Sequence, residues 1–471
     1  MERDVASRLR RRLEMSTAGA DFDLVVLGTG AGGSAPASKC RAAGWRVAVV
    51  DDQPYGGTCA LRGCDPKKVL VAASDVVSWS NRMLGHGVTG EGQATIDWPA
   101  LMRFKRTFTD PVPAARELAL TKEGIETLHG EASFLAEDRL LVGARELSAG
   151  HFVIAAGSGP RQLNIPGEEL VISSTGFLEM NSLPRRIAFI GAGYISLEFA
   201  HIAHRAGAEV VVIGRGAPLP HFDSSVVEKL VAHSREIGVD IRLDTTVTAV
   251  ERAGASGKFL VHAKAGDRAD SIETDLVVHG AGRVPNTARL GAQAGNVRLE
   301  RNGAIAVNEF LQSTTNPRVY AVGDIALPPG SLPLTPVAAH EGTIVASNLL
   351  NGNRKRPDYR GIPSVVFTQP PLASVGLTEK AAREQGINVR VKTGDTGGWY
   401  SNRIAREPVG MFKTIADADS DRIVGAHLLG RHAEEVINLL ALAIRNDISA
   451  TEMRRMVYAY PTSGSDVPYM V

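Results

Sequence analysis

Residues 22–33 read FDLVVLGTGAGG, an apolar run that ends directly in a cluster of glycines. The run Phe22–Leu27 predicts a short buried strand, residues 34–43 predict a helix, and residues 46–50 predict a second strand. In such a strand–helix–strand unit, glycines at the first turn let backbone N–H groups of the helix N-terminus face a pyrophosphate. The glycines of this turn are Gly28, Gly30 and Gly33. The stretch therefore predicts a nucleotide-binding fold.

An acidic residue supports this interpretation. Asp51 closes the second predicted strand, 18 residues after Gly33. A carboxylate at this place can accept hydrogen bonds from the hydroxyls of a ribose. The glycines alone are also compatible with an ordinary tight turn, so the prediction depends on strand, helix and acid occurring together.

A second unit of the same kind begins at Arg186. Residues 187–190 predict a strand, 195–206 a helix and 209–213 the next strand, and the turn after the first strand reads GAGYIS. Gly191 and Gly193 take the first two glycine places, and Ser196 takes the third. Finding the unit twice, about 160 residues apart, predicts two nucleotide-binding domains.

The two units differ at the place where a ribose-binding acid is expected. The second unit has Arg215 there, directly after Ile213 and Gly214. An acid would repel a 2′-phosphate, whereas an arginine attracts one, so the sequence favours NADPH over NADH. His221 is either a second phosphate contact or an ordinary loop histidine.

Two cysteines lie close together in the stretch GGTCALRGCDPKK, residues 56–68. Four residues separate Cys59 from Cys64, and we expect one helical turn to bring the thiols into disulfide range. A helix N-terminus and nearby lysines would lower a thiol pKa. Zinc is a poor alternative because two more ligands at matching spacing are missing; two unreactive buried cysteines are the other alternative. Cys40 is expected to be buried and inert.

Length and composition exclude several classes of protein. The 471 residues predict about three domains. Lys and Arg total 52 against 51 Asp and Glu, so no net field favours nucleic acid or an anionic membrane. No apolar run reaches the roughly 18 residues that cross a bilayer. The segment Met1–Glu14 carries five arginines and no apolar core, so it predicts a disordered extension or a targeting peptide but no secretory signal.

The order of five motifs carries a family resemblance. GTGAGG, GGTCALRGCDPKK, GAGYISLEFA, GAGRVPNT and VYAVGD follow one another as in the class I pyridine nucleotide–disulfide oxidoreductases, and the resemblance runs from about Asp21 to the C-terminus. It implies an α/β fold with two Rossmann-like domains, for FAD and NAD(P)H, and a C-terminal α+β dimerisation domain. The expected boundaries are 1–20 for an extension, 21–160 with 284–353 for FAD, 161–283 for NAD(P)H and 354–471 for dimerisation.

The resemblance also implies roles for individual residues. Cys59 would exchange with substrate, Cys64 would lie nearest the flavin, and Lys68 and Glu198 would pair beside flavin N5, where a cation stabilises reduced flavin. Tyr194 would cover the nicotinamide pocket. FAD would be held by Gly28, Gly30, Gly33, Asp51 and Asp324, with Thr335, Pro336 and Val337 near the flavin edge. The other residues expected at a cofactor are Gly57, Thr58, Gly157, Gly191, Gly193, Ile195, Arg215, Gly282, Arg283 and Gly323.

The pattern departs from the family near the C-terminus. The family's disulfide reductases have a His-Pro-Thr segment there, with a glutamate that orients the histidine of the partner subunit. This chain has Tyr460 in place of the histidine and Ser465 in place of the glutamate. A phenol with a pKa near 10 is a poor base at neutral pH. Mercuric reductases have a tyrosine nearby but add a C-terminal cysteine pair, which is missing here. Tyr460 is therefore either a substrate-pocket donor or a filler.

The sequence thus predicts an FAD-dependent homodimeric oxidoreductase of the cytoplasm. It would pass electrons from NAD(P)H, through flavin, to the Cys59–Cys64 disulfide and on to a disulfide, thiol or metal-ion acceptor. No resident metal, nucleic acid or membrane is expected. Two alternatives stay open: a flavin-level reductase of quinones or similar acceptors that does not need the cysteines, and a non-catalytic redox flavoprotein partner.

Overall fold

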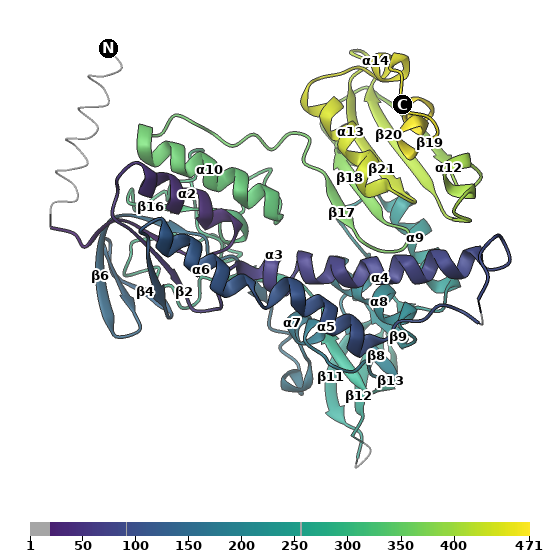
Figure 1. The fold of residues 1–471 in the computed structure, drawn as a ribbon, viewed down its shortest axis with the longest axis horizontal. Helices are drawn as coiled ribbons and strands as arrows, with labels where there is room; N and C mark the ends of the chain where they lie inside the picture. Colours follow the sequence, from purple (N-terminus) through teal and green to yellow (C-terminus); the bar gives the residue numbers. More distant parts are fainter. Residues whose placement is uncertain (1–18, 91, 255–256) are drawn as a thin grey trace. The chain divides into compact units, whose positions relative to one another are not determined.

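A computed structural model describes residues 19–90, 92–254 and 257–471 (Figure 1). The arginine-rich segment Met1–Glu14 lies outside the described residues. The chain divides into two compact units. Unit 1 contains residues up to Pro66, Arg106–Arg161 and Arg283–Tyr359, and unit 2 contains Lys67–Lys105, Gln162–Gly282 and Arg360–Val471. Each unit has its own sheets and cores, and each is described in turn.

Unit 1 is built on a mixed sheet with the strand order β3-β2-β1-β6-β5-β4, in which β16 also pairs with β6. Strands β3, β2, β1, β6 and β16 run parallel, while β4 and β5 join through antiparallel pairings. The strands are β1 (Phe22–Leu27), β2 (Val47–Asp51), β3 (Glu126–His129), β4 (Ala132–Ala136), β5 (Arg139–Val142), β6 (Arg145–Ile154) and β16 (Val319–Ala321), with a separate pair β7 (Ser158–Pro160) and β15 (Arg283–Pro285). The helices are α2 (Ala31–Ala42), α3 (Gly57–Arg62), α6 (Val112–Lys122), α10 (Thr335–Asn351) and the short η2 (Gly323–Ile325).

The parallel strands of unit 1 are covered on both faces, and this explains why β1 is a continuous apolar run. Leu24 and Val26 belong to one buried cluster, whereas Val25 and Leu27 belong to another. Strands buried on both faces lose the alternation of polar and apolar residues that half-exposed strands show. Helix α10 lies along α2 (Figure 1), and glycines allow the approach, since a Cβ on Gly342 would lie under 3.0 Å from a backbone oxygen of α2.

Unit 2 contains a parallel sheet with the order β10-β9-β8-β14, a three-stranded antiparallel sheet β11-β12-β13 and a five-stranded antiparallel sheet β17-β18-β21-β20-β19. The first two sheets are formed by β8 (Arg186–Ile190), β9 (Glu209–Ile213), β10 (Asp240–Arg242), β11 (Thr246–Arg252), β12 (Phe259–Ala265), β13 (Arg268–Thr274) and β14 (Leu276–His279). The third is formed by β17 (Ser364–Val366), β18 (Leu372–Gly376), β19 (Val389–Asp395), β20 (Met411–Asp417) and β21 (Ile423–Leu429).

The helices of unit 2 include two that come from the first quarter of the chain. Leu70 and Met102, on α4 and α5, are fully buried in one cluster with Phe177 and Phe199. This packing places residues 67–105, which were predicted to belong to the FAD-binding domain, with unit 2.

The helices of unit 2 are α4 (Cys64–Met83, which begins in unit 1), α5 (Trp98–Thr109, which ends in unit 1), η1 (Glu168–Leu170), α7 (Ser174–Leu178), α8 (Tyr194–Arg205), α9 (Ser224–Glu236), α11 (Glu379–Glu384), α12 (Tyr400–Arg403), α13 (Ala433–Arg445), α14 (Ala450–Arg455), η3 (Ser463–Asp466) and α15 (Val467–Met470).

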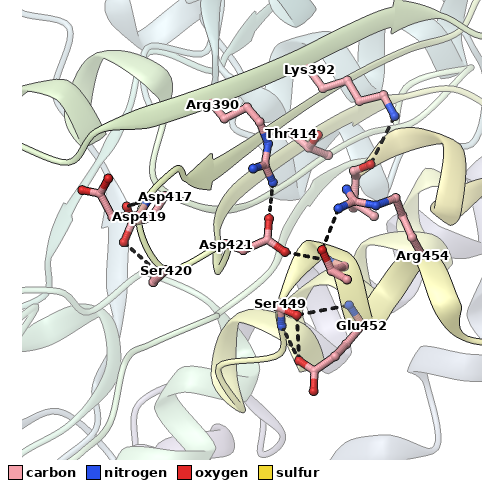
Figure 2. A network of polar contacts seen from close by, with 12 residues as sticks. Arg390, Lys392, Thr414, Asp417, Asp419, Ser420, Asp421, Ser449, Glu452 and Arg454 are labelled. Atoms are coloured by element: carbon pink, nitrogen blue, oxygen red, sulfur yellow. Dashed lines mark hydrogen bonds and ion pairs between the residues drawn. The ribbon is translucent and has the colours of Figure 1, made fainter.

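The α+β architecture of the C-terminal part is held by a polar network as well as by a core. Figure 2 shows Asp421, after β20, between Arg390 of β19 and helix α14. Its carboxylate accepts from the Arg390 guanidinium and, at 2.8 Å, from the backbone N–H of Thr451. Helix α14 is capped by a reciprocal pair in which Ser449 and Glu452 bond each other's backbone. Hydrogen bonds to charged groups therefore tie the sheet to this helix.

The predicted α/β fold with two Rossmann-like units and a C-terminal α+β part is confirmed. Strands 22–27, 187–190 and 209–213 lie within one residue of the predicted positions, and the helix predicted at 195–206 is α8 (Tyr194–Arg205). Among the described residues, no helix is both long and apolar enough to cross a membrane.

Candidate functional site

Each unit carries one glycine turn between a strand and a helix, and the two turns have the same backbone conformation. Gly28 and Gly191 both have φ +103°. A Cβ on Gly28 would lie under 3.0 Å from the carbonyl oxygen of Ala155, and a Cβ on Gly191 would meet Gly280 in the same way. Only glycine combines this positive φ with such a close approach. Both turns therefore require glycine for a structural reason as well as for access to a ligand.

The helix after each turn begins without a side-chain cap. Gly30 is the N-cap of α2 and Gly193 is the N-cap of α8, and a glycine has no side chain that could accept a hydrogen bond from the first N–H groups of the helix. The N–H groups in the first turn of such a helix, together with the positive end of its dipole, favour a bound anion. Each glycine turn, together with the helix N-terminus that follows it, is called a glycine cradle below: Gly28–Gly30 in unit 1 and Gly191–Gly193 in unit 2. The two cradles fit the pyrophosphates of two dinucleotides, one in each unit.

Asp51 closes β2 beside the first cradle. Its Oδ2 accepts hydrogen bonds from Thr29 at 2.8 Å (N–H) and 2.6 Å (O–H), and its Oδ1 accepts from the Gln53 N–H at 2.9 Å. A carboxylate has about four acceptor sites, so these bonds fix its orientation and leave capacity for a ribose hydroxyl. The predicted place of Asp51 at the end of the second strand is confirmed.

The other residues predicted to hold FAD also lie in unit 1. Asp324 accepts from Ser158 Oγ at 2.7 Å, and Arg283 donates to that same hydroxyl at 2.9 Å and to the Ser158 carbonyl. Thr335 and Pro336 open α10, and Val337 is buried. Unit 1 contains Gly28, Gly30, Gly33, Asp51, Gly57, Thr58, Gly157, Arg283, Gly323, Asp324, Thr335, Pro336 and Val337.

A buried carboxylate that the sequence analysis missed organises the start of α10. Glu341 is completely buried and accepts from the Gly323 N–H at 2.6 Å, Ser331 Oγ at 2.8 Å and Tyr359 Oη at 2.7 Å. It thereby ties the AVGD turn to α10. A signal was present, since Glu341 is the one acidic residue in this helix.

The two cysteines of the GGTCALRGC stretch lie on different helices. Cys59 belongs to α3, Cys64 is the first residue of α4, and Gly63 between the helices has φ −143° and ψ −112°. The expectation of a single helical turn is therefore wrong. In one continuous helix, residues five apart point about 140° away from each other, so the break at Gly63 is what brings the thiols together.

Both cysteines are free thiols in this structure. The pKa of the Cys59 thiol is raised, first by its hydrogen bond with Cys64 and then by burial. The expected lowering of a thiol pKa is thus wrong for Cys59, because the contact with Cys64 and burial favour the protonated thiol over the thiolate. Cys64 sits at the N-terminus of α4 and lies 3.7 Å from Thr335 Oγ1. The geometry favours negative charge on Cys64 and the proton on Cys59. Cys40, as expected, is buried, and burial raises its pKa to about 12.

The lysine that pairs with Glu198 is Lys67. Its Nζ lies 2.8 Å from Oε1 and 2.7 Å from Oε2 of the carboxylate, whose side chain is only 2% exposed. The prediction that Lys68 forms this pair is wrong. Neighbouring residues of a helix point about 100° apart, so only one of the two lysines can face Glu198. Lys68 instead places its ammonium 4.1 Å from the centre of the Phe367 ring, and the Phe367 N–H donates to Glu198.

The residues predicted to bind NAD(P)H lie in unit 2. Tyr194 and Ile195 open α8, with Tyr194 44% exposed. Arg215 follows β9 and is exposed, and within the described part of the chain it forms no ion pair. The buried hydroxyl of Ser196, at the third glycine place, has no hydrogen-bond partner among the described residues and packs on Gly280. Unit 2 contains Lys68, Gly191, Gly193, Tyr194, Ile195, Glu198, Arg215, Gly282 and Tyr460.

Tyr460 has no orienting carboxylate among the described residues. Its side chain is 80% exposed. Ser465, at the place of the family's glutamate, donates instead to the Thr462 carbonyl at 2.6 Å. The neighbouring Asp466 accepts from Ser401 Oγ at 2.5 Å, and burial raises the pKa of Asp466. Of the two residues at the places of that acid–base pair, Tyr460 is thus exposed and Ser465 bonds within its own turn.

Comparison with known proteins agrees with this geometry. Residues 22–342 match the model of the pyridine nucleotide-disulphide oxidoreductases, and residues 362–470 match the dimerisation domain of the same family. Glutathione reductase of Burkholderia cepacia is 34% identical over 94% of this chain and 96% of its own length. Mercuric reductase of Staphylococcus aureus is 31% identical over 94% of this chain and 80% of its own length.

A solved structure matches as well. The HOCl-induced flavoprotein disulfide reductase RclA of Escherichia coli, determined as a Cu(II) complex, superposes with a TM-score of 0.85 at 26% identity, over 96% of this chain and 99% of that one. FAD and a nicotinamide dinucleotide are the cofactors of these oxidoreductases, and the two glycine cradles fit them. The chain therefore belongs to the pyridine nucleotide–disulphide oxidoreductase family.

Proposed function

We propose that this protein is an NADPH-dependent reductase whose Cys59–Cys64 pair delivers electrons to a disulfide or metal-ion acceptor. The observation that carries the proposal is the thiol pair itself: a proton-donating Cys59 in contact with Cys64 at a helix N-terminus, in the unit that holds the first dinucleotide cradle. Bound FAD would supply two-electron chemistry between the nicotinamide and the thiols. The chain's own residues would hold the charge and the proton on the two sulfurs.

The class of acceptor follows from the relatives and from the C-terminal segment. The relatives' names describe reduction of glutathione disulfide and of mercury, and the structural relative binds Cu(II). The replacement of the histidine by Tyr460 removes the base on which the disulfide reductases rely, a loss worth roughly 10²- to 10⁴-fold. We propose an acceptor that needs little proton transfer from the protein, such as an activated disulfide or a thiol-binding metal ion.

The preference for NADPH rests on Arg215. This exposed guanidinium follows β9, at the end of the strand where an NADH-specific site would have an acid. A guanidinium binds a phosphate through two parallel hydrogen bonds. Residues 161–283 are accordingly proposed as the NADPH-binding domain, and residues 21–160 with 284–353 as the FAD-binding domain.

We further propose a homodimer that works in the cytoplasm. The match of residues 362–470 to a dimerisation domain supports self-association. The same segment exposes large apolar side chains, and a partner would cover surfaces of this kind: Leu442 is 56% exposed, Val457 98% and Tyr469 68%. A reducing compartment suits a protein with three free cysteines.

Steady-state kinetics with a panel of acceptors tests the function. Disulfides, metal ions and quinones are offered to the holoenzyme with NADPH and with NADH, alongside Cys59→Ser and Cys64→Ser. We expect both substitutions to lower turnover of the best disulfide or metal acceptor by at least about 10²-fold, because thiolates are the exchanging nucleophiles. Turnover of the best acceptor that is unchanged in Cys59→Ser would replace the proposal with a flavin-level reductase.

A further inference from the structure

The Cys59 thiol has a second polar neighbour, the carboxylate of Asp65. Asp65 is the second residue of α4 and is exposed, and its Oδ1 accepts a hydrogen bond from Cys59 Sγ at 3.8 Å. An acid in the first turn of a helix is also favoured by the helix dipole. The dipole explains an acid at any position of that turn, but it does not explain the contact with the thiol.

The charge of Asp65 is not neutralised by the cation nearest in sequence. Arg62 turns to Gln53, whose Oε1 accepts from Nη1 at 3.2 Å. None of the described residues forms an ion pair with Asp65. The negative charge acts on the sulfur: after the hydrogen bond with Cys64, burial and the charge of Cys64, the field of Asp65 also contributes to raising the pKa of Cys59. A molecule that approaches Cys59 therefore meets an unpaired carboxylate.

We propose that Asp65 is a specificity-determining residue that makes the Cys59 end of the dithiol favour cationic electron acceptors over anionic ones. The inference rests on the proposed function, since it requires that Cys59 is the thiol that exchanges with the acceptor. A unit charge at about 4–6 Å in largely aqueous surroundings changes such an encounter by up to about tenfold for each charge of the acceptor that comes near. Cationic acceptors of this class are disulfides of protonated amines and metal cations.

The exchange step balances without any further reagent. Cys59 sulfur attacks one sulfur of the acceptor disulfide, the acceptor S–S bond breaks, and the first thiol leaves with the proton of Cys59. The Cys64 thiolate then attacks Cys59 sulfur in the mixed disulfide, and the second thiol leaves as a thiolate, which takes its proton from water. The Cys59–Cys64 disulfide that forms has lost two electrons to the acceptor. Asp65 lies beside the sulfur at which both bonds change.

Two probes of equal length and opposite charge measure this effect. Cystamine carries two ammonium groups and 3,3′-dithiodipropionate carries two carboxylates, each two carbons from the disulfide. The reduced holoenzyme is mixed with either probe and reoxidation is followed by stopped flow. The ratio of the two second-order rate constants, cystamine over dithiodipropionate, is compared among wild type, Asp65→Asn and Asp65→Glu.

We expect the ratio to fall at least about tenfold in Asp65→Asn and to stay within about threefold of wild type in Asp65→Glu, which keeps the charge. High salt should lower the wild-type ratio toward that of Asp65→Asn, because exposed charges are screened. Partial loss of folded enzyme cancels, since each ratio is taken within one variant. An unchanged ratio in Asp65→Asn at low salt overturns the inference. If Cys59→Ser reacts with both probes as fast as wild type, the proposed function fails, and this inference fails with it.

Discussion

Lys67 Nζ lies 2.7 Å from Glu198 Oε2 in a pair whose two side chains are 12% and 2% exposed, while the adjacent Lys68 lies over the ring of Phe367. Lys67 Nζ also lies 4.9 Å from the centre of that ring, so the two lysines differ in the ion pair with Glu198 and not in the aromatic contact. Removing the single ammonium partner of a buried carboxylate lowers the free energy of unfolding strongly, because the charge that remains is unpaired and shielded from water. An exposed ammonium over an aromatic ring contributes only about 0.5–1 kcal/mol. The pair gives a direct contrast between two matched substitutions.

The first prediction compares Lys67→Met with Lys68→Met. We expect Lys67→Met to destabilise the holoenzyme by about 3–5 kcal/mol, because Glu198 loses its ion-pair partner. On the expectation that the lysine of this pair lies beside flavin N5, the substitution should also slow reduction of the bound flavin by NADPH about 10²-fold, because a cation that would stabilise reduced flavin is lost. Lys68→Met should change stability by no more than about 1 kcal/mol. Denaturant unfolding and stopped-flow flavin reduction measure the two effects. Equal effects of the two substitutions would contradict the assignment of Lys67.

We predict that substitutions in the two glycine cradles weaken the binding of different cofactors, FAD for Gly28 and NADPH for Gly191. In Gly28→Ala the new Cβ would collide with the Ala155 carbonyl in unit 1, and in Gly191→Ala it would collide with Gly280 in unit 2. We expect Gly28→Ala to be purified with little FAD. Gly191→Ala should keep FAD and raise the KM for NADPH at least about tenfold, since a strained backbone at one such site costs about 1–3 kcal/mol. The ratio of flavin to protein absorbance and steady-state kinetics measure these effects. A Gly191→Ala protein without FAD would argue against two independent sites.

The choice of nicotinamide is predicted to depend on Arg215. Replacement by glutamate should lower kcat/KM for NADPH about 10²-fold or more, because a charge-assisted pair with the 2′-phosphate becomes a repulsion. The value for NADH should change less than about threefold. Arg215→Lys, which keeps the charge but loses the two-pronged geometry, should give an intermediate preference. Equal decreases in kcat/KM for NADPH and NADH in Arg215→Glu would show that Arg215 does not bind the 2′-phosphate.

The polar network between β19, Asp421 and α14 predicts an acid-sensitive contribution to stability from Asp421 (Figure 2). The hydrogen bond from Arg390, followed by those from Thr451, holds the pKa of this carboxyl well below its usual range. A depressed pKa in the folded state means that the contribution is complete above the unfolded value of about 3.9 and is lost as the pH falls toward the folded value. Asp421→Asn should therefore lower the unfolding free energy at pH 7 by about 1–3 kcal/mol.

The difference between wild type and Asp421→Asn should shrink as the pH falls below about 4, which urea unfolding as a function of pH measures. Asp417→Asn is the matched control. Among the described residues, the Asp417 carboxylate accepts from its own turn, from the Asp419 N–H and Ser420 Oγ, so its replacement should have a smaller effect at pH 7. A constant difference across the pH range would contradict the proposed role of the Asp421 charge.

Local sequence patterns were sufficient to predict the parts of the fold that depend on neighbouring residues. The runs that become β1, β8 and β9 are apolar on every residue but one or two, and glycines end β1 and β8 where the chain turns into a helix. Asp51 was correctly placed because its position depends only on the length of the strand it closes.

What the sequence could not predict depends on contacts between distant residues. The pattern of α4 and α5 shows apolar faces, but it does not show that Leu70 and Met102 pack with Phe177 and Phe199 in unit 2. From the sequence, either Lys67 or Lys68 could pair with Glu198. The direction in which each side chain leaves α4 decides the partner, and it is Lys67. The break at Gly63 was missed because CALRGC is compatible with one continuous helix until the backbone angles of the glycine are known.

Anaerobic titration of the FAD-loaded protein with NADPH tests the central claim most directly. The account predicts a long-wavelength charge-transfer absorbance from the Cys64 thiolate to the flavin, present in wild type and in Cys59→Ser and missing in Cys64→Ser. If that absorbance is absent from the wild-type protein, or if it persists unchanged in Cys64→Ser, the thiol pair does not receive the electrons and the account is wrong.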